Sequence, residues 1–327
     1  MDKETILVTG GAGFIGSHLV ERLLKEDYKV ICLDNFNDYY DPNLKEKNIS
    51  SVLRNPNFEL IRGDILDISL LRKIFSGRQF KNLSTKPEVI IHLAALAGVR
   101  SSIGSPKIYV DVDIKGTVNL LEMAREFDIK QFIFASSSSV YGVNKKVPFS
   151  EDDPLPLQIS PYATAKRSAE LFCETYNHLF DIPITILRLF TVYGERQRPD
   201  MAIRKFTKFI FLGKPIPMFG DGSSIRDYTY VSDCIDSFIS ALKNPFDFEI
   251  FNVGSGWTIE LRELVELIGR IAEREVKVEH LNEQIGDVPV TYADITKTSK
   301  ILGYKPKVSI EEGIKRFINW YRNEFDK

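Results

Sequence analysis

The chain has 327 residues, of which 43% are hydrophobic, so it is long enough for one large domain or for two linked domains. Its 43 basic and 45 acidic residues leave a formal net charge of −2 and are spread along the chain, which excludes a clustered charged surface for nucleic acid or membranes. The three cysteines and four histidines lack metal-ligand spacing, and an odd number of cysteines argues against a disulfide framework.

The N-terminus runs directly into a strand pattern rather than into the apolar core of a signal peptide. No segment reaches the roughly 18 uninterrupted apolar residues that a membrane-spanning helix needs. We therefore expect a cytoplasmic protein with no metal site, no nucleic-acid partner and no membrane contact.

The first half of the chain alternates short apolar runs with segments of helical period, which is typical of a parallel sheet covered on both faces. The predicted strands are Thr5–Thr9, Val30–Leu33, Phe58–Ile61, Val89–Leu93, Gln131–Ser136 and Ile184–Leu189. The predicted helices are Phe14–Lys25, Pro106 to about Phe127, and Pro161–Phe180. This pattern predicts an α/β fold with a Rossmann-type doubly wound parallel sheet.

After Gly194 the rhythm changes, and short strands mix with helices. Strands are predicted near Ile216–Phe219 and Arg226–Tyr230, and helices near Met201–Leu212 and Ser232–Leu242. Apolar residues at helical spacing predict a further helix over Ile259–Ala272, with Thr258 as its N-cap. Phe251–Val253 is expected to rejoin the first sheet. The pattern predicts a smaller mixed α/β domain in the C-terminal half.

A glycine-rich turn follows the first strand. Gly10, Gly13 and Gly16 allow a tight turn and a close approach of backbone amides to a pyrophosphate, at the N-terminus of the next helix. Asp34, 18 residues after Gly16, ends the second strand, where a carboxylate suits the two hydroxyls of an adenosine ribose and repels a 2′-phosphate. The motif thus favours NAD over NADP. The alternative is a tight strand–turn–helix that binds nothing.

Two further places suggest contacts with a ligand. Asp64, in the run Gly63–Ile65 after the third strand, is either an adenine contact or a helix cap. Tyr162 and Lys166 lie four residues apart on a predicted helix, hence on one face, and a phenol beside an ammonium group is easier to ionise. With a hydroxyl from the end of the strand, such a pair makes a proton-transfer device. Taken alone, the pair would be read as an incidental surface Tyr and Lys.

The combination of motifs resembles the extended short-chain dehydrogenase/reductase family, specifically its nucleotide-sugar epimerases and dehydratases. The resemblance runs from the first glycine motif to about Gly303. The matching stretches are TGGAGFIGSH, RGDILD, HLAALAGVR, SSSSVYG, SPYATAK, LRLFTVYGERQRPDM, FGDGSSIRDYTYVSD, FNVGSG and GDVPVTYAD. It implies an NAD-binding Rossmann domain over residues 1–183, with 226–254 crossing back into it, and a nucleotide-sugar-binding domain over 184–225 and 255–327.

The family implies a role for each catalytic residue. Tyr162 is the general base, Ser137 is its hydroxyl partner, and Lys166 orients the nicotinamide ribose and lowers the pKa of Tyr162. The proton of a sugar hydroxyl goes to Tyr162 while hydride passes to NAD, and the 4-keto sugar rotates before the hydride returns to its other face. The cofactor contacts that the resemblance implies are Gly10, Gly13, Phe14, Ile15, Gly16, Asp34, Asn35, Asp64, Ile65, Leu93, Ala94, Ala95, Tyr162 and Lys166.

The row of four serines, Ser136–Ser139, distinguishes among the reactions of the family. Dehydratases place Asp-Glu at the positions of Ser138 and Ser139, so the catalysts of elimination are missing here, and a decarboxylase is also disfavoured. Epimerisation remains. The stretches LRLFTVYGERQRPDMA, ASSSSVYG and AGVR most resemble UDP-glucuronate 4-epimerases. UDP-glucose 4-epimerases usually have Asn at the position of Thr191. Ser137, Ser138, Ser139 and Thr191 would then bind the C5 carboxylate of the UDP-sugar.

Other residues are expected at the substrate by the same resemblance. Arg198 and Arg226 suit the ribose-diphosphate, because a guanidinium presents a fork of donors to phosphate. Arg100 is a further candidate, and Asp287 resembles an acid that contacts ribose. Gln284 replaces a common Arg, and Asp113 stands where an Asn commonly helps to hold the nicotinamide end.

A homodimer is expected, formed through the two predicted helices at 106–127 and 161–180. Three other functions stay open at this point. One is a 4-epimerase of the neutral sugars of UDP-glucose or UDP-N-acetylglucosamine. Another is a non-catalytic NAD-binding scaffold. The third is a net oxidoreductase that releases NADH, since fold does not imply function.

Overall fold

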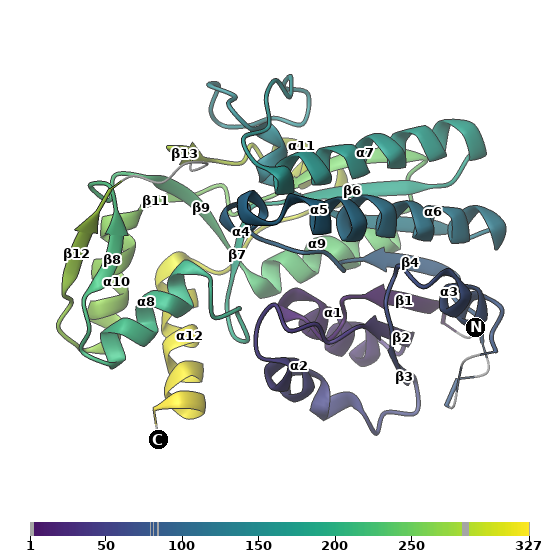
Figure 1. Cartoon of the computed structure of the whole chain (residues 1–327), viewed down its shortest axis with the longest axis horizontal. Helices are drawn as coiled ribbons and strands as arrows, with labels where there is room; N and C mark the ends of the chain where they lie inside the picture. Colours follow the sequence, from purple (N-terminus) through teal and green to yellow (C-terminus); the bar gives the residue numbers. More distant parts are fainter. Residues whose placement is uncertain (1–2, 79, 81, 84, 283–287, 327) are drawn as a thin grey trace.

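A computed structural model describes residues 3–78, 80, 82–83, 85–282 and 288–326. A seven-stranded sheet, in which every paired strand is parallel to its neighbour, forms the larger part of the molecule (Figure 1). Its strands, in spatial order, are β10 Phe248–Val253, β6 Ile184–Leu189, β5 Gln131–Ser137, β4 Val89–His92, β1 Thr5–Thr9, β2 Lys29–Asp34 and β3 Phe58–Arg62. The predicted doubly wound sheet is confirmed, as is the return of residues 251–253 to it.

Alternate residues of each strand supply two cores, one on each face of the sheet. Leu7 of β1 packs in the core that contains α3 (Ile68–Phe75), α6 (Gly116–Glu126) and α7 (Pro161–Phe180). Its neighbours Ile6 and Val8 pack in the core that contains α1 (Phe14–Lys25) and α9 (Val231–Lys243). Both faces are therefore buried, which explains why the strands read as continuous apolar runs.

The second half of the chain adds a smaller unit, on the left in Figure 1. It contains a four-stranded sheet of β7 Thr191–Tyr193, β9 Ile225–Tyr230, β11 Thr258–Glu260 and β13 Val290–Thr291, and a two-stranded sheet of β8 Ile216–Phe219 and β12 Val278–Leu281. Its helices are α8 Ala202–Phe211, α10 Leu261–Ala272 and α12 Ile310–Phe325, whereas α11 Thr296–Leu302 packs against β10 and α9 of the larger part. Among the described residues, no helix is both long enough and apolar enough to cross a membrane.

The predicted helix with Thr258 as its cap was wrong at its start. Thr258–Glu260 is a strand that pairs antiparallel with β9, and the helix begins only at Leu261. Glu260 is the N-cap, and it forms a capping box with Glu263. The periodic apolar pattern was read correctly, but the pairing partner at Ile225–Asp227 is distant in sequence and gave no local signal.

Strand pairing also changes two details of the expected division into domains. The segment expected to cross back at 226–254 contributes Ile225–Tyr230 to the small sheet, and only α9 and β10 lie with the large one. Conversely, β6 lies inside the large sheet, although residues from 184 onward were assigned to the other domain. The two-domain division itself stays a prediction.

The predicted helix from Pro106 to Phe127 is helical throughout but not uniform. It comprises α5 Pro106–Tyr109, a π-helical stretch over Val110–Lys115, and α6. The remaining short elements are α2 Pro42–Ile49, α4 Val99–Gly104 and two 3₁₀ turns at Ser50–Val52 and Ser138–Tyr141.

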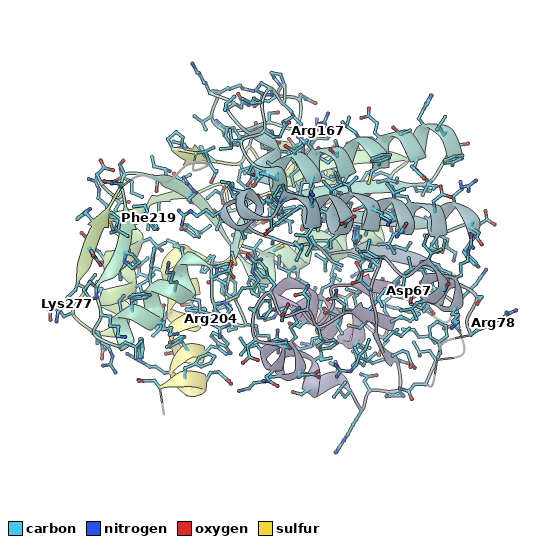
Figure 2. All side chains as sticks on the ribbon, viewed as in Figure 1. Asp67, Arg78, Arg167, Arg204, Phe219 and Lys277 are labelled. Carbon is cyan, nitrogen blue, oxygen red and sulfur yellow. The ribbon has the colours of Figure 1, made fainter. Side chains whose placement is uncertain are left out.

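A buried ion pair joins the large sheet to α7. Arg188 of β6 and Glu170 of α7, with side chains 2% and 0% exposed, meet through two hydrogen bonds of 2.9 Å each. Ser136, at the end of β5, donates a third hydrogen bond to Glu170 at 2.6 Å. Arg167, labelled in Figure 2, adds a contact of 3.0 Å from the rim. The pair thus ties α7 to the ends of two central strands.

We predict that Glu170→Ala lowers the free energy of unfolding by about 3–5 kcal/mol, because it leaves the Arg188 charge buried without its partner. Glu174→Ala, at an exposed position one turn along α7, is the matched control and should change stability by about 0.5 kcal/mol or less. Urea unfolding of both variants measures the difference, and equal effects would contradict the importance of the pair.

Candidate active site

One cavity of about 190 Å³ lies along the carboxyl ends of the parallel strands. It is situated where the strand order reverses between β1 and β4, the place where open α/β sheets bind ligands. The cavity brings together every predicted cofactor residue: Gly10, Gly13, Phe14, Ile15, Gly16, Asp34, Asn35, Asp64, Ile65, Leu93, Ala94, Ala95, Tyr162 and Lys166. These residues come from strand ends and from the N-terminal parts of α1 and α7, so the sheet and the helices packed on it bring them together.

The glycine turn is shaped for close approach. Gly10 has a φ of +69°, and a Cβ there would lie 2.8 Å from the Ala94 nitrogen. A Cβ at Gly16 would overlap the Gly10 carbonyl oxygen. Gly13 is the N-cap of α1 and offers no side-chain cap, so the amides of the first helical turn adjoin the cavity. This arrangement fits a pyrophosphate at a helix N-terminus.

Asp34 lines the cavity at the end of β2. Its Oδ2 accepts a hydrogen bond from the Ala12 nitrogen at 3.1 Å, and its Oδ1 accepts one from the Phe36 nitrogen at 2.8 Å. Burial raises the pKa of Asp34, while the ammonium of Lys45, 4.0 Å away, lowers it. The carboxylate is thus held rigidly at the cavity, as recognition of ribose hydroxyls requires.

The sequence did not predict some of the residues that line the cavity next to Asp34. Tyr39, Tyr40 and Lys45 also line the cavity, from the loop and helix that follow β2. The aromatic pair within NDYY was an available signal, but nothing in its spacing indicated the direction of the side chains. At Asp64, the helix-cap interpretation was wrong, because Asp67 caps α3. Asp64 instead accepts a hydrogen bond from Asn35 at 2.8 Å.

Lys166 is buried beneath the cavity. Its ammonium donates to the Ala135 carbonyl at 2.9 Å and lies 4.9 Å from the centre of the Phe134 ring. Burial lowers the pKa of Lys166, and the carboxyl of Asp113 raises it. This opposition keeps a cation available at the base of the site despite its desolvation.

Tyr162 lies one turn earlier on the same face of α7, with its ring edge-on to that of Tyr109 at 6.2 Å. Burial raises the pKa of Tyr162 to about 12, and the Ser137 hydroxyl lowers it. Asp113 raises this pKa and Arg198 lowers it. The protein residues together raise this pKa, so the lowered pKa that the family resemblance implies does not arise from them alone. The expected juxtaposition of Ser137 with Tyr162 is present.

The serine row has a divided structure. Ser136 is turned inward to Glu170. Ser137 donates to the Ser139 hydroxyl at 3.1 Å and accepts from the Ser139 nitrogen at 3.2 Å. Ser138 and Ser139 line a second, small cavity of about 50 Å³, together with Ser160 and Thr291. Ser138 and Ser139 thus line the small cavity, Ser136 lines the main cavity while it donates to Glu170, and Ser137 lines neither.

The expected substrate residues are only partly gathered. Arg198 lines the main cavity and is held by Asp200 through hydrogen bonds of 3.0 and 2.9 Å. Arg100 reaches from α4 to the ring of Phe219 on β8, 4.8 Å away, a residue labelled in Figure 2. Arg226 contacts the carbonyls of its own sheet. Thr191 lines neither cavity. Asp287 and Gln284 lie outside the described residues.

No group of three or more histidines, cysteines or acids in the described part of the chain is arranged to hold a metal ion. The polar groups of the main cavity are instead a set of backbone amides, carboxylates, phenols, two ammonium groups and the guanidinium of Arg198. That set can bind a dinucleotide and move a proton beside it.

We predict that Gly16→Ala weakens NAD binding about tenfold or more, because the methyl group would displace the Gly10 carbonyl from the turn. The control is Gly104→Ala, where an added Cβ meets nothing within 4 Å. Calorimetric titration with NAD measures both variants. Unchanged affinity for the first variant would show that the turn does not carry the ligand.

Residues 7–317 match the family model described as GDP-mannose 4,6 dehydratase. A UDP-glucuronate 4-epimerase of Thermodesulfobacterium geofontis is 43% identical, over 98% of this chain and 97% of that protein. Among solved structures, the UDP-glucuronic acid 4-epimerase of Bacillus cereus, in complex with UDP-glucuronic acid and NAD, has a TM-score of 0.90 at 38% identity and covers 98% of this chain and 100% of its own.

The UDP-glucose 4-epimerase of Thermotoga maritima, with UDP-glucose, has a TM-score of 0.88 at 35% identity, covering 98% of this chain and 99% of its own. Matches of this length and identity extend over both the large sheet and the smaller unit. The chain therefore belongs to the family that the GDP-mannose 4,6-dehydratase model describes, among the nucleotide-sugar epimerases and dehydratases of the extended short-chain dehydrogenases/reductases.

Proposed function

We propose that the protein is an NAD-dependent UDP-sugar 4-epimerase that interconverts UDP-glucuronate and UDP-galacturonate. The observation that carries this proposal is the single cavity shared by the glycine turn, Asp34, Tyr162 and Lys166, with Ser137 beside the phenol. The UDP-glucuronate 4-epimerases among its relatives support the same activity.

The residues present fit NAD. The first turn of α1 would bind the pyrophosphate, Asp34 the adenosine ribose, and Lys166 the nicotinamide ribose. Asp64 and Asn35, which are hydrogen-bonded to each other, would lie toward the adenine. When bound, the nicotinamide supplies a reversible hydride acceptor and a positive charge next to the phenol.

The chain itself supplies the proton chemistry. Tyr162 takes the proton of the C4 hydroxyl as the C4 hydride leaves, and later returns it to the C4 oxygen of the epimer. Ser137 hydrogen-bonds the same oxygen. The Lys166 ammonium donates to the Ala135 carbonyl, and the nearby charge of Asp113 opposes the lowering of its pKa by burial. Because burial raises the pKa of Tyr162 to about 12, the phenol keeps its proton until additional positive charge adjoins it. The phenol therefore does not lose its proton before the substrate is aligned.

The dehydratase reaction in the name of the family model is not the reaction that we propose for this protein. Elimination needs an acid and a base next to the 4-keto sugar, and the positions that resemble the Asp-Glu pair of dehydratases hold Ser138 and Ser139. Both side chains line the small cavity, where hydroxyls can bind oxygen without removing a proton. Epimerisation by rotation of the 4-keto sugar is the reaction that these residues still permit.

The same hydroxyls favour a uronic acid. Ser138 and Ser139, with Ser137 between them and Tyr162, offer donors to a C5 carboxylate, and Thr191 is assigned to that group as well. Arg198, Arg226 and Arg100 are assigned to the diphosphate, and Asp287 to the uridine ribose. The alternative is a 4-epimerase of neutral sugars, which the similarity to the Thermotoga maritima UDP-glucose 4-epimerase keeps open.

A homodimer is part of this proposal. Ile108 and Val110 are 48% and 54% exposed, and on α7 Leu171, Phe172 and Leu179 are 46%, 39% and 60% exposed. α5 and α7 are neighbours, so these side chains form one apolar face suited to a second copy. The three cysteines are free and buried, in keeping with the predicted cytoplasmic location.

We predict that the purified protein converts UDP-glucuronate into UDP-galacturonate without net formation of NADH. NMR of the sugar nucleotides and absorbance of NADH during turnover measure both quantities. Tyr162→Phe, which keeps the ring against Tyr109, should lose about a hundredfold or more of the activity and retain NAD binding. Accumulating NADH would indicate a net oxidoreductase, and the absence of turnover with any UDP-sugar would favour a scaffold.

We predict that the double variant Ser138→Ala with Ser139→Ala raises the KM for UDP-glucuronate and increases loss of CO₂ to a pentose product. The reason is that the carboxylate of the 4-keto uronate would no longer be held away from the geometry of decarboxylation. UDP-glucose, which has no carboxylate, is the matched control and should be affected little. Equal losses on both substrates would mean that the serines are structural, and would favour the neutral-sugar epimerase.

A further inference from the structure

Asp113 is a buried acid to which the reaction described above assigns no proton transfer and no contact with the sugar. It lies in the π-helical stretch between α5 and α6 and is 1% exposed. Its Oδ1 accepts a hydrogen bond of 2.7 Å from the Leu96 nitrogen. Its Oδ2 is buried and has no hydrogen-bond partner. A buried carboxylate oxygen without a donor is costly, so a purely structural role would be served better by an amide or by an apolar residue.

The π-helical stretch that contains Asp113 is itself linked to the sheet by side-chain hydrogen bonds. The Thr117 hydroxyl donates to the Asp113 carbonyl at 2.6 Å and is 3.0 Å from the Nε2 of His92. The Nδ1 of His92 is 2.8 Å from the Thr9 hydroxyl. The Thr117 hydroxyl has one proton, and it donates that proton to the Asp113 carbonyl. The Nε2 of His92 is therefore the donor in its contact with Thr117, and His92 is the neutral tautomer with Nε2–H. The backbone at Asp113 is therefore fixed by a chain that reaches β1.

The groups that face Asp113 come from three other elements. Tyr162 and Lys166 extend from α7, Tyr109 from α5, and the neutral His92 from β4 through Thr117. Burial raises the pKa of Asp113 to about 6, and Lys166 lowers it. In return, Asp113 raises the pKa of Lys166 and of both tyrosines. No hydrogen bond joins Asp113 to Lys166, so the influence is electrostatic and acts without direct hydrogen bonding.

We propose that Asp113 is a positioning residue whose ionisation sets the charge balance of the Tyr162–Lys166 pair. Ionised, Asp113 holds Lys166 as the ammonium and opposes loss of the Tyr162 proton. Protonated, Asp113 exerts neither effect, and the unpartnered Oδ2 carries a hydroxyl proton that it can donate. The proposal rests on the proposed role of Tyr162 as general base, but the state of the carboxyl is measurable without turnover.

The first test uses the full chain without substrate. Infrared difference spectra of wild type against Asp113→Asn should show a carboxylic acid that titrates near pH 6. The amide keeps the acceptor for the Leu96 nitrogen, so the variant should fold. Because the folded carboxyl binds its proton more tightly than the unfolded one, ionisation costs stability. The melting temperature of the variant minus that of wild type should therefore increase as the pH rises from about 4 to 6, and should then stay constant.

The second test is the pH profile of kcat/KM with UDP-glucuronate. Removing the negative charge should move both limbs of the profile of Asp113→Asn to lower pH, each by about one unit, since Tyr162 and Lys166 both lose a proton more easily. The two enzymes should coincide below about pH 6, where Asp113 of wild type is protonated. Asp111→Asn is the matched control: it removes the same charge from an exposed position two residues away and should leave both limbs in place.

The outcomes separate the two proposals. No titrating acid in the infrared spectrum, a melting difference that does not vary with pH, or equal shifts from Asp111→Asn would overturn the role of Asp113. If the spectrum and the melting curves behave as stated but no UDP-sugar is epimerised, the buried acid stands and the proposed function fails.

Discussion

The position of the active site depends on two charges that have no access to water. Arg188 on β6 and Glu170 on α7 can be buried only if each satisfies the other, and their two parallel hydrogen bonds allow a single placement of the helix over the sheet. Glu170 also accepts from Ser136. That contact fixes the end of β5, and the next residue is Ser137. Lys166 and Tyr162 stand on the same helix, about one and two turns before Glu170 respectively. The geometry of phenol, ammonium and serine is thus inherited from a structural ion pair beneath them.

The proposed chemistry requires a charged Lys166 and a Tyr162 phenol that can lose its proton, although both groups are buried away from water. Burial works against both, since it lowers the pKa of Lys166 and raises that of Tyr162. Asp113 helps the lysine and hinders the tyrosine, while Arg198 lowers the pKa of the tyrosine. The phenol therefore depends on a positive charge arriving with a ligand. A base that becomes effective only in the assembled complex suits an enzyme whose 4-keto sugar must not escape.

Membership of the family leaves the chemistry open, because one scaffold carries dehydratases and epimerases alike. The difference lies in few side chains at the ends of the central strands. In the proposed function, Ser138 and Ser139 supply hydroxyls where elimination would need acids, and Ser139 is hydrogen-bonded to Ser137. The buried pair uses a different serine, because Glu170 accepts from Ser136.

Local patterns in the sequence were sufficient for most elements and for the cofactor wall. The strand Thr5–Thr9, the helices Phe14–Lys25 and Pro161–Phe180, and the glycine turn follow from periodicity, capping and backbone freedom, all of which act between residues near in the chain. The predicted cofactor residues met in one cavity because the parallel strands end along one edge, where α1 begins and the N-terminal part of α7 packs. What the sequence left undecided depends on partners far along the chain. Thr258–Glu260 became a strand through β9, and Ser136 became a core residue through Glu170. Asp113 acquired its burial and its solitary oxygen only when the π-turn packed against α7. Burial and charge coupling are properties of the assembled interior, so only the tertiary structure could decide them.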